Sequence, residues 1–299
     1  MNFESIDVKK EFEYFDSVAP RKTIKILGKD FTYRYYKNPD PKVDATMLML
    51  AGGSGLGDAF AGMARAFTEK YSLINFNYPL GFTDNEAMAD AIAELIKNIG
   101  ATNVYLWGQS YGGALAQIIA KKHPEVVKGL ILTSTASMTG NLRYEGMKCL
   151  VNMFSEEKEK KDIKTYKKLP MSLLPVLLNL AFKVKMKDNP AGQRVVKDFI
   201  DYLKPDLTRE YFIHMTRLLC DLRNHLGTHR KEDFEYLRGR ILVIEPEDDD
   251  TFTADVKEGL INDMPDPVVN REISGGHLAM MFDTDNFIDV IDRFMSEQK

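Results

Sequence analysis

Apolar residues in this chain fall into two kinds of run. Short runs that are apolar almost throughout, such as 46–50 and 240–244, are typical of strands buried on both faces of a sheet. Longer runs with apolar residues at helical spacing, such as 84–98, lie between them. Strands and helices alternate in this way from residue 46 to residue 133 and again after residue 240. The alternation predicts an α/β fold, with a mostly parallel sheet and helices on both of its faces.

The pattern predicts about eight strands, and the first two form an antiparallel hairpin around Gly28-Lys29-Asp30. The predicted strands are 23–27, 31–36, 46–50, 73–76, 104–107, 127–133, 240–244 and 268–273. The predicted helices of the sheet region are 58–70, 84–98 with Asp84 as its cap, 114–120, 253–263 and 284–296. Residues 1–20 are charged and weakly patterned, and we expect them to pack along the outside.

No strand pattern occurs between Thr133 and Arg240, where helical segments are broken at Pro170, Pro190 and Pro205. We interpret this stretch as a helical insertion that lies over the carboxyl ends of the strands. The predicted organisation is therefore a core of residues 1–135 and 240–299, with a helical cap of residues 136–239 inserted after the sixth strand.

Charge is distributed unevenly between the insertion and the rest of the chain. Residues 141–240 hold 21 Lys and Arg against 14 Asp and Glu, a net +7, whereas the remainder holds 19 against 30, a net −11. The basic run 158–168 is interpreted as a solvated helix face. The apolar run 169–182 is expected to pack the insertion onto the sheet, and part of it is expected to line a pocket for an apolar group.

Composition narrows the class of protein. The net charge of −4 argues against a nucleic-acid binder, and no apolar run approaches the length of a membrane span. The start, residues 1–7, lacks the apolar region of a signal peptide. Cys149 and Cys220 are the only cysteines, which fits the reducing cytoplasm better than a disulfide-bonded protein. We expect a cytoplasmic protein that acts on a small molecule.

Cofactor motifs are missing from the sequence. The glycine-rich run 52–57 breaks the Gly-x-Gly-x-x-Gly spacing, and no Walker Lys-Ser/Thr follows it. No His-Glu-x-x-His occurs. We therefore expect no nucleotide cofactor and no metal.

A candidate nucleophile lies in Gly108-Gln109-Ser110-Tyr111-Gly112, between a predicted strand and a predicted helix. This is the context of a nucleophile elbow, in which a serine occupies a strained turn with its hydroxyl exposed. A side chain at Gly108 or Gly112 would collide with the neighbouring backbone, because strand and helix pass close together there. The following helix points its amino terminus at the site, which favours developing negative charge.

Two more parts of such a site follow other strands. The loop 51–55 after the third strand is free of bulky side chains, and an oxyanion hole takes one N–H from this loop and one from the residue after the nucleophile. We nominate Gly53 and Tyr111 as these donors, and Ser54 as a substrate contact. His277 follows the last strand on a glycine-rich turn and is the candidate base, because a base must come within hydrogen-bond reach of the serine.

The acid that orients this histidine should follow the strand 240–244. The loop there holds five carboxylates, Glu245, Glu247, Asp248, Asp249 and Asp250. Nothing in the residues alone selects one of them. The order along the chain is nevertheless serine, then acid, then histidine.

With this order the chain resembles an α/β-hydrolase with a helical cap along nearly its whole length. The resemblance rests on Gly108 to Gly113, the glycine loop, the acidic turn after Ile244 and Gly275-Gly276-His277. In the family the acid usually stands five residues past the strand, which implies Asp249, with Asp248 and Asp250 as rivals.

The resemblance implies acyl transfer to water by Ser110, Asp249 and His277 through a covalent intermediate. We expect a serine hydrolase of the esterase or thioesterase kind, acting on a small or apolar acyl substrate. An aminopeptidase or amidase of the same fold is an alternative, and so is a binding or adaptor protein that retains the fold without turnover.

Overall fold

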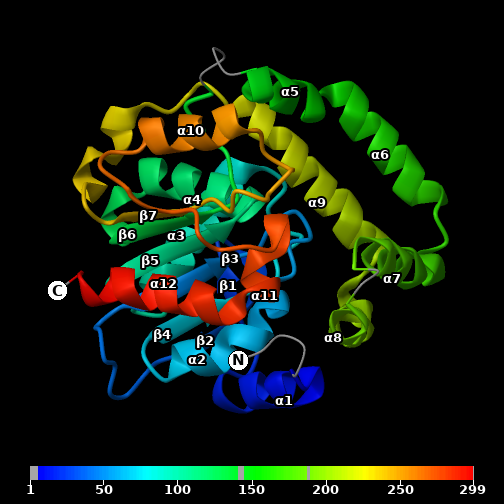
Figure 1. Cartoon of the computed structure of the whole chain (residues 1–299), viewed down its shortest axis with the longest axis horizontal. Coiled ribbons are helices and arrows are strands. Elements are labelled where there is room, and N and C mark those ends of the chain that lie inside the picture. Colours follow the sequence, from blue (N-terminus) through cyan, green and yellow to red (C-terminus); the bar gives the residue numbers. More distant parts are fainter. Residues whose placement is uncertain (1–5, 141–144, 187–188, 299) are drawn as a thin grey trace.

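Eight strands form one sheet in the order β1-β2-β4-β3-β5-β6-β7-β8 (Figure 1). The structure is a computed structural model, and it describes residues 6–140, 145–186 and 189–298. β2 pairs antiparallel with β1 and with β4, and every other pair is parallel. The strands are β1 Lys22–Ile26, β2 Lys29–Tyr36, β3 Thr46–Leu50, β4 Ser72–Asn75, β5 Val104–Gln109, β6 Gly129–Thr133, β7 Ile241–Ile244 and β8 Val268–Asn270. The predicted sheet, including its first hairpin, is confirmed.

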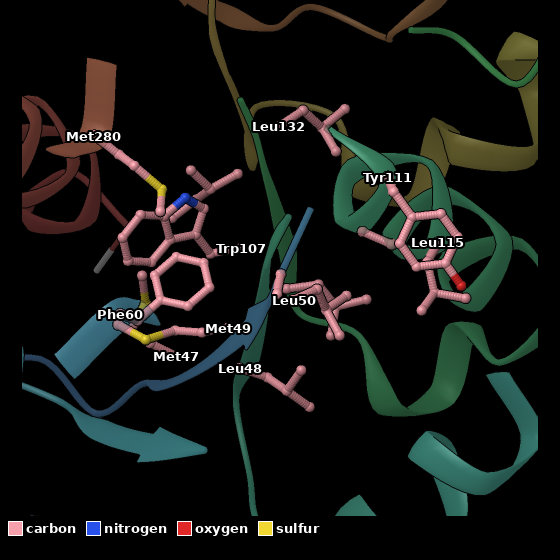
Figure 2. Packing of buried hydrophobic residues seen from close by; sticks show 14 of the residues in the cluster. Met47, Leu48, Met49, Leu50, Phe60, Trp107, Tyr111, Leu115, Leu132 and Met280 are labelled. Atoms are coloured by element: carbon pink, nitrogen blue, oxygen red, sulfur yellow. The ribbon is translucent and has the colours of Figure 1, made fainter. Parts of the chain in front are cut away.

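The central strands are buried on both faces, as their continuous apolar runs require. All residues of β3, β5, β6 and β7 are buried. Successive side chains of a strand point to opposite faces. Figure 2 shows the result, with Met47 and Met49 beside Trp107 on one face and Leu48 and Leu50 on the other.

Helices cover both faces of the sheet (Figure 1). α3 and α4 cover one face, and α2 and α12 cover the other, where Trp107 of β5 contacts the rings of Phe67 and Phe287. Asp84 caps α3 by accepting a hydrogen bond from the amide of Ala87 at 2.8 Å, as the sequence predicts. The helices outside the insertion are α1 Val8–Val18, α2 Ala61–Thr68, α3 Asn85–Asn98, α4 Tyr111–Lys122, α10 Ala254–Asp263, α11 Ala279–Phe282 and α12 Thr284–Ser296.

A helical insertion separates β6 from β7, and its described residues contain no strand. Its helices are α5 Glu145–Met153, α6 Glu156–Lys168, α7 Leu174–Lys185, α8 Pro190–Leu203 and α9 Arg209–Asp221. They form an arch beside the carboxyl ends of the strands (Figure 1). The helical insertion predicted after the sixth strand is confirmed, and α6 ends before Pro170 while α8 begins at Pro190. None of the helices in the described ranges is long and apolar enough to cross a bilayer.

Residues at the amino terminus differ from the prediction. They form α1, a helix that the sequence analysis did not assign, and Phe12 and Phe15 on its inner face are fully buried. Phe12 makes an edge contact with Phe199 of α8 at 5.6 Å between ring centroids, so the helix joins the core to the insertion. The prediction that residues 1–7 hold no signal peptide falls on a stretch of which residues 1–5 lie outside the described residues.

Candidate active site

Ser110 lies in a tight turn between β5 and α4. Its backbone has φ 54° and ψ −118°, a conformation that residues other than glycine rarely adopt. A Cβ on Gly112 would lie 2.0 Å from the carbonyl oxygen of Leu50, and one on Gly108 would lie 2.3 Å from that of Gly112. Both positions therefore require glycine, because strand, turn and helix are packed backbone against backbone.

Hydrogen bonds from the next strand hold this turn in place. The amide of Ser110 donates to the carbonyl of Thr133 at 2.9 Å, and the hydroxyl of Thr135 donates to the carbonyl of Ser110 at 2.7 Å. The main chain of Ser110 is thus fixed by the end of β6, and its half-buried side chain is left to face His277.

His277 contacts the serine directly. Its Nε2 lies 3.0 Å from Oγ of Ser110, which is within hydrogen-bond distance. Gly275 and Gly276, just before it, have φ values of 113° and 62°. These left-handed conformations favour glycine, and they turn the chain so that the imidazole faces the end of β5.

Asp249 completes a line of three side chains. Its Oδ2 lies 2.9 Å from Nδ1 of His277, and its Oδ1 accepts a hydrogen bond from the amide of Thr251 at 2.8 Å. Burial alone would raise the pKa of this carboxyl, but the contacts with His277 and Thr251 outweigh burial and hold the pKa below its usual range. Asp249 is therefore ionised at neutral pH and stabilises a positive charge on the imidazole.

The other four carboxylates of this loop have different surroundings. Asp248 accepts hydrogen bonds from the amides of Gly275 and Gly276 at 2.8 and 3.0 Å, so it holds the histidine turn rather than the imidazole. Glu247 and Asp250 are exposed. Of the five candidates, Asp249 is the one that the structure brings to His277.

Glu245 is buried at the end of β7. One of its carboxyl oxygens accepts a hydrogen bond from the amide of Thr135 at 3.1 Å, and the other has no partner among the described residues. Burial and, to a smaller extent, the negative charge of Asp249 raise the pKa of this carboxyl to about 8, although the hydrogen bond from Thr135 opposes them. Glu245 is therefore mostly protonated at neutral pH, and it supports the same Thr135 that holds Ser110.

The glycine loop after β3 is fixed by two tyrosines. The hydroxyl of Tyr78 donates to the carbonyl of Ala51 at 2.9 Å, and the hydroxyl of Tyr211, from α9, donates to that of Gly55 at 2.7 Å. The amides of Gly53 and Tyr111, nominated as oxyanion donors, donate to no other residue in the described part of the chain.

Gln109, which the sequence analysis did not single out, joins three parts of the site. Its Nε2 donates to the carbonyl of His277 at 3.1 Å. A Cβ on Gly52 would lie only 2.1 Å from its Oε1, so its amide lies against the glycine loop. In the sequence, only its position next to Ser110 indicated that Gln109 belongs to the site. That position does not show where its side chain points.

An apolar cavity of about 290 Å³ begins beside these residues. Gln109 and Leu278, the chain neighbours of Ser110 and His277, line it, together with Ser54, the nominated substrate contact. Leu178 and Phe182 of α7 also line it. The remaining lining residues are Ala51, Gly52, Leu56, Ala59, Phe60, Val196, Phe199, Ile200, Leu203, Leu207, Phe212, Met280 and Met281.

Other histidines have other environments. His123 forms a 2.7 Å contact with Asp90, and burial lowers the pKa of His214 and His229 to about 4. Within residues 6–140, 145–186 and 189–298, no group of three or more His, Cys, Asp or Glu is placed to hold a metal ion. The expectation of no metal and no cofactor stays a prediction.

Comparison with known proteins identifies the fold. A sequence profile described as alpha/beta hydrolase fold matches residues 45–166, which include the turn. The chain has the α/β-hydrolase fold. The fold predicted from the sequence is confirmed.

Distant relatives of this α/β-hydrolase are named as esterases or lipases. It is 29% identical over 203 residues to a Mycoplasma genitalium protein named "Putative esterase/lipase 2", a match that covers 62% of this chain and 74% of that protein. It is 28% identical over 152 residues to a Haemophilus influenzae protein named "Putative esterase/lipase". That match covers 48% of this chain and 51% of the relative, so it spans about half of the relative's length.

The fold also matches solved structures. An esterase from Exiguobacterium antarcticum superposes on this α/β-hydrolase with a TM-score of 0.66 and 20% sequence identity. The superposition covers 92% of this chain and 99% of that esterase. At this identity the likeness concerns the fold alone.

Proposed function

We propose that this α/β-hydrolase is a serine hydrolase that cleaves a carboxylic ester or thioester with an apolar acyl group. The observation that carries the proposal is the continuous line from Asp249 through His277 to Ser110, with contacts of 2.9 and 3.0 Å. This line ends beside an apolar cavity. A nucleophile, a base and an orienting acid within hydrogen-bond reach are the requirements of covalent acyl transfer.

The reaction takes place in two halves. In the first, Oγ of Ser110 attacks the carbonyl carbon while Nε2 of His277 accepts the hydroxyl proton. The leaving alcohol or thiol receives that proton as the bond to the acyl carbon breaks. In the second, His277 takes a proton from water as the water oxygen attacks the acyl carbon. The bond from that carbon to Oγ of Ser110 then breaks, Oγ receives the proton back from Nε2, and the acid is released. Asp249 accepts a hydrogen bond from Nδ1–H throughout and stabilises the charged imidazole.

The amides of Gly53 and Tyr111 hold the oxyanion in this proposal. Tyr111 is the first residue of α4, so its amide points out of the helix amino terminus, where negative charge is favoured. Removing one donor of this kind lowers the rate by about 10²- to 10³-fold in a related mechanism. The tyrosine hydroxyls on Ala51 and Gly55 keep the loop that carries Gly53 in position.

We propose further that residues 136–239 act as a cap on a core of residues 1–135 and 240–299. Helices α7, α8 and α9 of this cap supply most of the outer lining of the cavity, and the core supplies Gln109, Leu278 and Met280. An acyl chain in the cavity would be enclosed between them, with its carbonyl at Ser110. Residues 141–144 and 187–188 of the cap lie outside the described residues.

The proposal is tested with nitrophenyl esters whose acyl chains range from acetyl to decanoyl. We expect wild-type protein to hydrolyse them and Ser110→Ala, checked for folding by circular dichroism, to lose about 10⁴-fold or more of the turnover. Wild-type protein that turns over none of these esters, or their thioester counterparts, would contradict the proposal. Equal turnover by Ser110→Ala would also contradict it.

A further inference from the structure

Helix α7 carries apolar side chains on two opposite faces. Leu174 is buried, and Leu178 and Phe182 line the cavity. The opposite face is open to solvent, with side chains exposed by 47 to 70%. These residues are Leu173, Val176, Leu177, Leu180 and Val184. We call them the outer stripe. Their spacing of three, four, seven and eleven residues from Leu173 places them in one row along the helix.

The outer stripe departs from the prediction for this run, which was expected to pack onto the sheet. Of the large apolar side chains that are exposed in the described residues, five of twelve belong to this stripe. Single exposed apolar residues are ordinary, but a contiguous apolar patch on a protein surface usually marks a place where something binds.

The segment that carries the outer stripe is positively charged. Residues 156–185 hold eight lysines and four acidic residues, a net +4. α6, which leads into α7, has no buried residue, and Lys161, Lys164 and Lys168 on it are exposed. Lys183 is exposed next to Val184. α6 and α7 together form the outer rim of the insertion, far from the sheet (Figure 1).

We propose that α6 and α7 dock on an anionic lipid surface. The outer stripe enters the boundary between headgroups and acyl chains, and the lysines lie at the level of the lipid phosphates. A helix with one apolar face and flanking lysines binds an interface in this way, through buried apolar area and attraction to anionic headgroups. The helix lies on the surface and does not cross it.

Charge also selects this occupant over a second copy of the chain. Pairing two outer stripes would bring two +4 segments together, each within a stretch, residues 141–240, of net +7, and like charges at an interface are unfavourable. An anionic lipid surface instead neutralises them.

Docking would place α7 between the lipid and the cavity, so the cavity would lie one helix away from the lipid surface. If the proposed esterase function holds, this closeness points to lipid esters as the substrate class. That last step rests on the proposed function, whereas the docking itself does not.

The test is co-sedimentation of the full-length protein with vesicles of phosphatidylcholine alone and of phosphatidylcholine mixed with phosphatidylglycerol. We expect binding to the mixed vesicles and at least tenfold weaker binding to phosphatidylcholine. The double variant Val176→Asp, Leu180→Asp should bind the mixed vesicles at least tenfold more weakly than wild type. Lys161→Gln with Lys164→Gln should weaken binding and reduce its dependence on salt.

Leu27→Asp is the matched control, because Leu27 is 58% exposed in the turn between β1 and β2. It should bind vesicles like wild type. Turnover of a water-soluble acetyl ester, followed in every variant, separates loss of docking from loss of catalysis or of folding. The proposal is overturned if wild type does not bind the mixed vesicles, or if the stripe variant binds them equally well. It is also overturned if the protein forms a dimer without lipid that the stripe variant abolishes.

Discussion

At the scale of single residues, the candidate site depends on which carboxylate reaches His277. Asp249 holds Nδ1 at 2.9 Å and is itself fixed by the amide of Thr251. A carboxylate in this place keeps the imidazole in the tautomer whose Nε2 can accept the serine proton. An amide in the same place can instead donate to Nδ1 and leave the hydrogen on Nε2.

We therefore predict that Asp249→Asn lowers kcat for ester hydrolysis by about 10⁴-fold while the protein stays folded. Asp250→Asn, at the neighbouring exposed carboxylate, should leave kcat within about twofold of wild type. Steady-state kinetics on one soluble ester measure both. A similar loss in the two variants would show that the loop as a whole, and not Asp249, supports the reaction.

Glu245 gives a prediction about pH and stability. Its pKa rises from 4.5 to about 8 because it is buried, so the folded protein keeps a proton that the unfolded chain loses. Stability from this residue is therefore greatest below about pH 4.5 and decreases as pH rises to about 8. Gln at this position keeps the acceptor for Thr135 and removes the titration.

The midpoint of thermal unfolding should accordingly fall less between pH 5 and pH 8 in Glu245→Gln than in wild type. Scanning calorimetry at the two values measures the difference. An equal fall in both proteins would mean that Glu245 is ionised in the folded state at neutral pH.

Sequence alone could nominate Ser110 and His277, because each follows a strand on a glycine-rich turn that few other residues share. It could not choose the acid without the family spacing, since five carboxylates follow β7 within six residues. Direction decides among them, and it is set by the turn that buries Asp249 while Asp250 faces solvent. The role of Gln109 could not be predicted for the same reason, because the direction of its side chain is seen only where it packs against Gly52.

At the scale of elements, the site requires β5, α4 and β3 to be in backbone contact. Gly112 lies where a Cβ would be 2.0 Å from the carbonyl oxygen of Leu50. We predict that Gly112→Ala destabilises the fold by about 3 kcal/mol or more, because the backbone must move to admit a methyl group. Gly53→Ala is the control, since a Cβ there meets nothing within 4 Å. Urea unfolding of the two variants should separate them, and equal losses would contradict the close packing.

Elements were predictable wherever apolar patterning was long or continuous. The strands β3 and β7, which are apolar almost throughout, and the capped helix α3 follow from their sequences. α1 was missed because its buried residues are few and are separated by charged ones, and what they bury against, Phe199 of α8, is remote in the sequence. The prediction for α7 was wrong in part because apolar side chains lie on all sides of this helix. The local sequence therefore does not show which face packs against the core.

At the scale of the whole molecule, the cavity lies between the insertion and the sheet region, so its size depends on both. Leu178 on the inner face of α7 is only half-buried, and a larger side chain there can be directed into the cavity. We predict that Leu178→Trp lowers kcat/KM for decanoyl relative to acetyl esters by about tenfold.

Val176→Trp, on the outer face of the same helix, should leave that ratio unchanged for esters free in solution. Kinetics across the acyl-length series provide the measurement. If Leu178→Trp lowers turnover of all esters alike, or of none, the cavity does not hold the acyl chain.

The fold class and the place of the insertion were predictable because alternation of strands and helices is a property of the whole sequence, and it stops at Thr133 and resumes at Arg240. The cavity was not predictable in its detail. Its lining comes from segments as distant as Ser54, Phe199 and Met281, which only the packed insertion brings together.

The most direct test of the central claim is labelling of the folded protein with a fluorophosphonate, followed by mass analysis of its peptides. An activated serine reacts with this probe, whereas an ordinary serine does not. The account predicts an adduct on Ser110, which is absent in Ser110→Ala and strongly reduced in His277→Ala. Folded wild-type protein that forms no adduct, or forms one on another serine, would contradict the account.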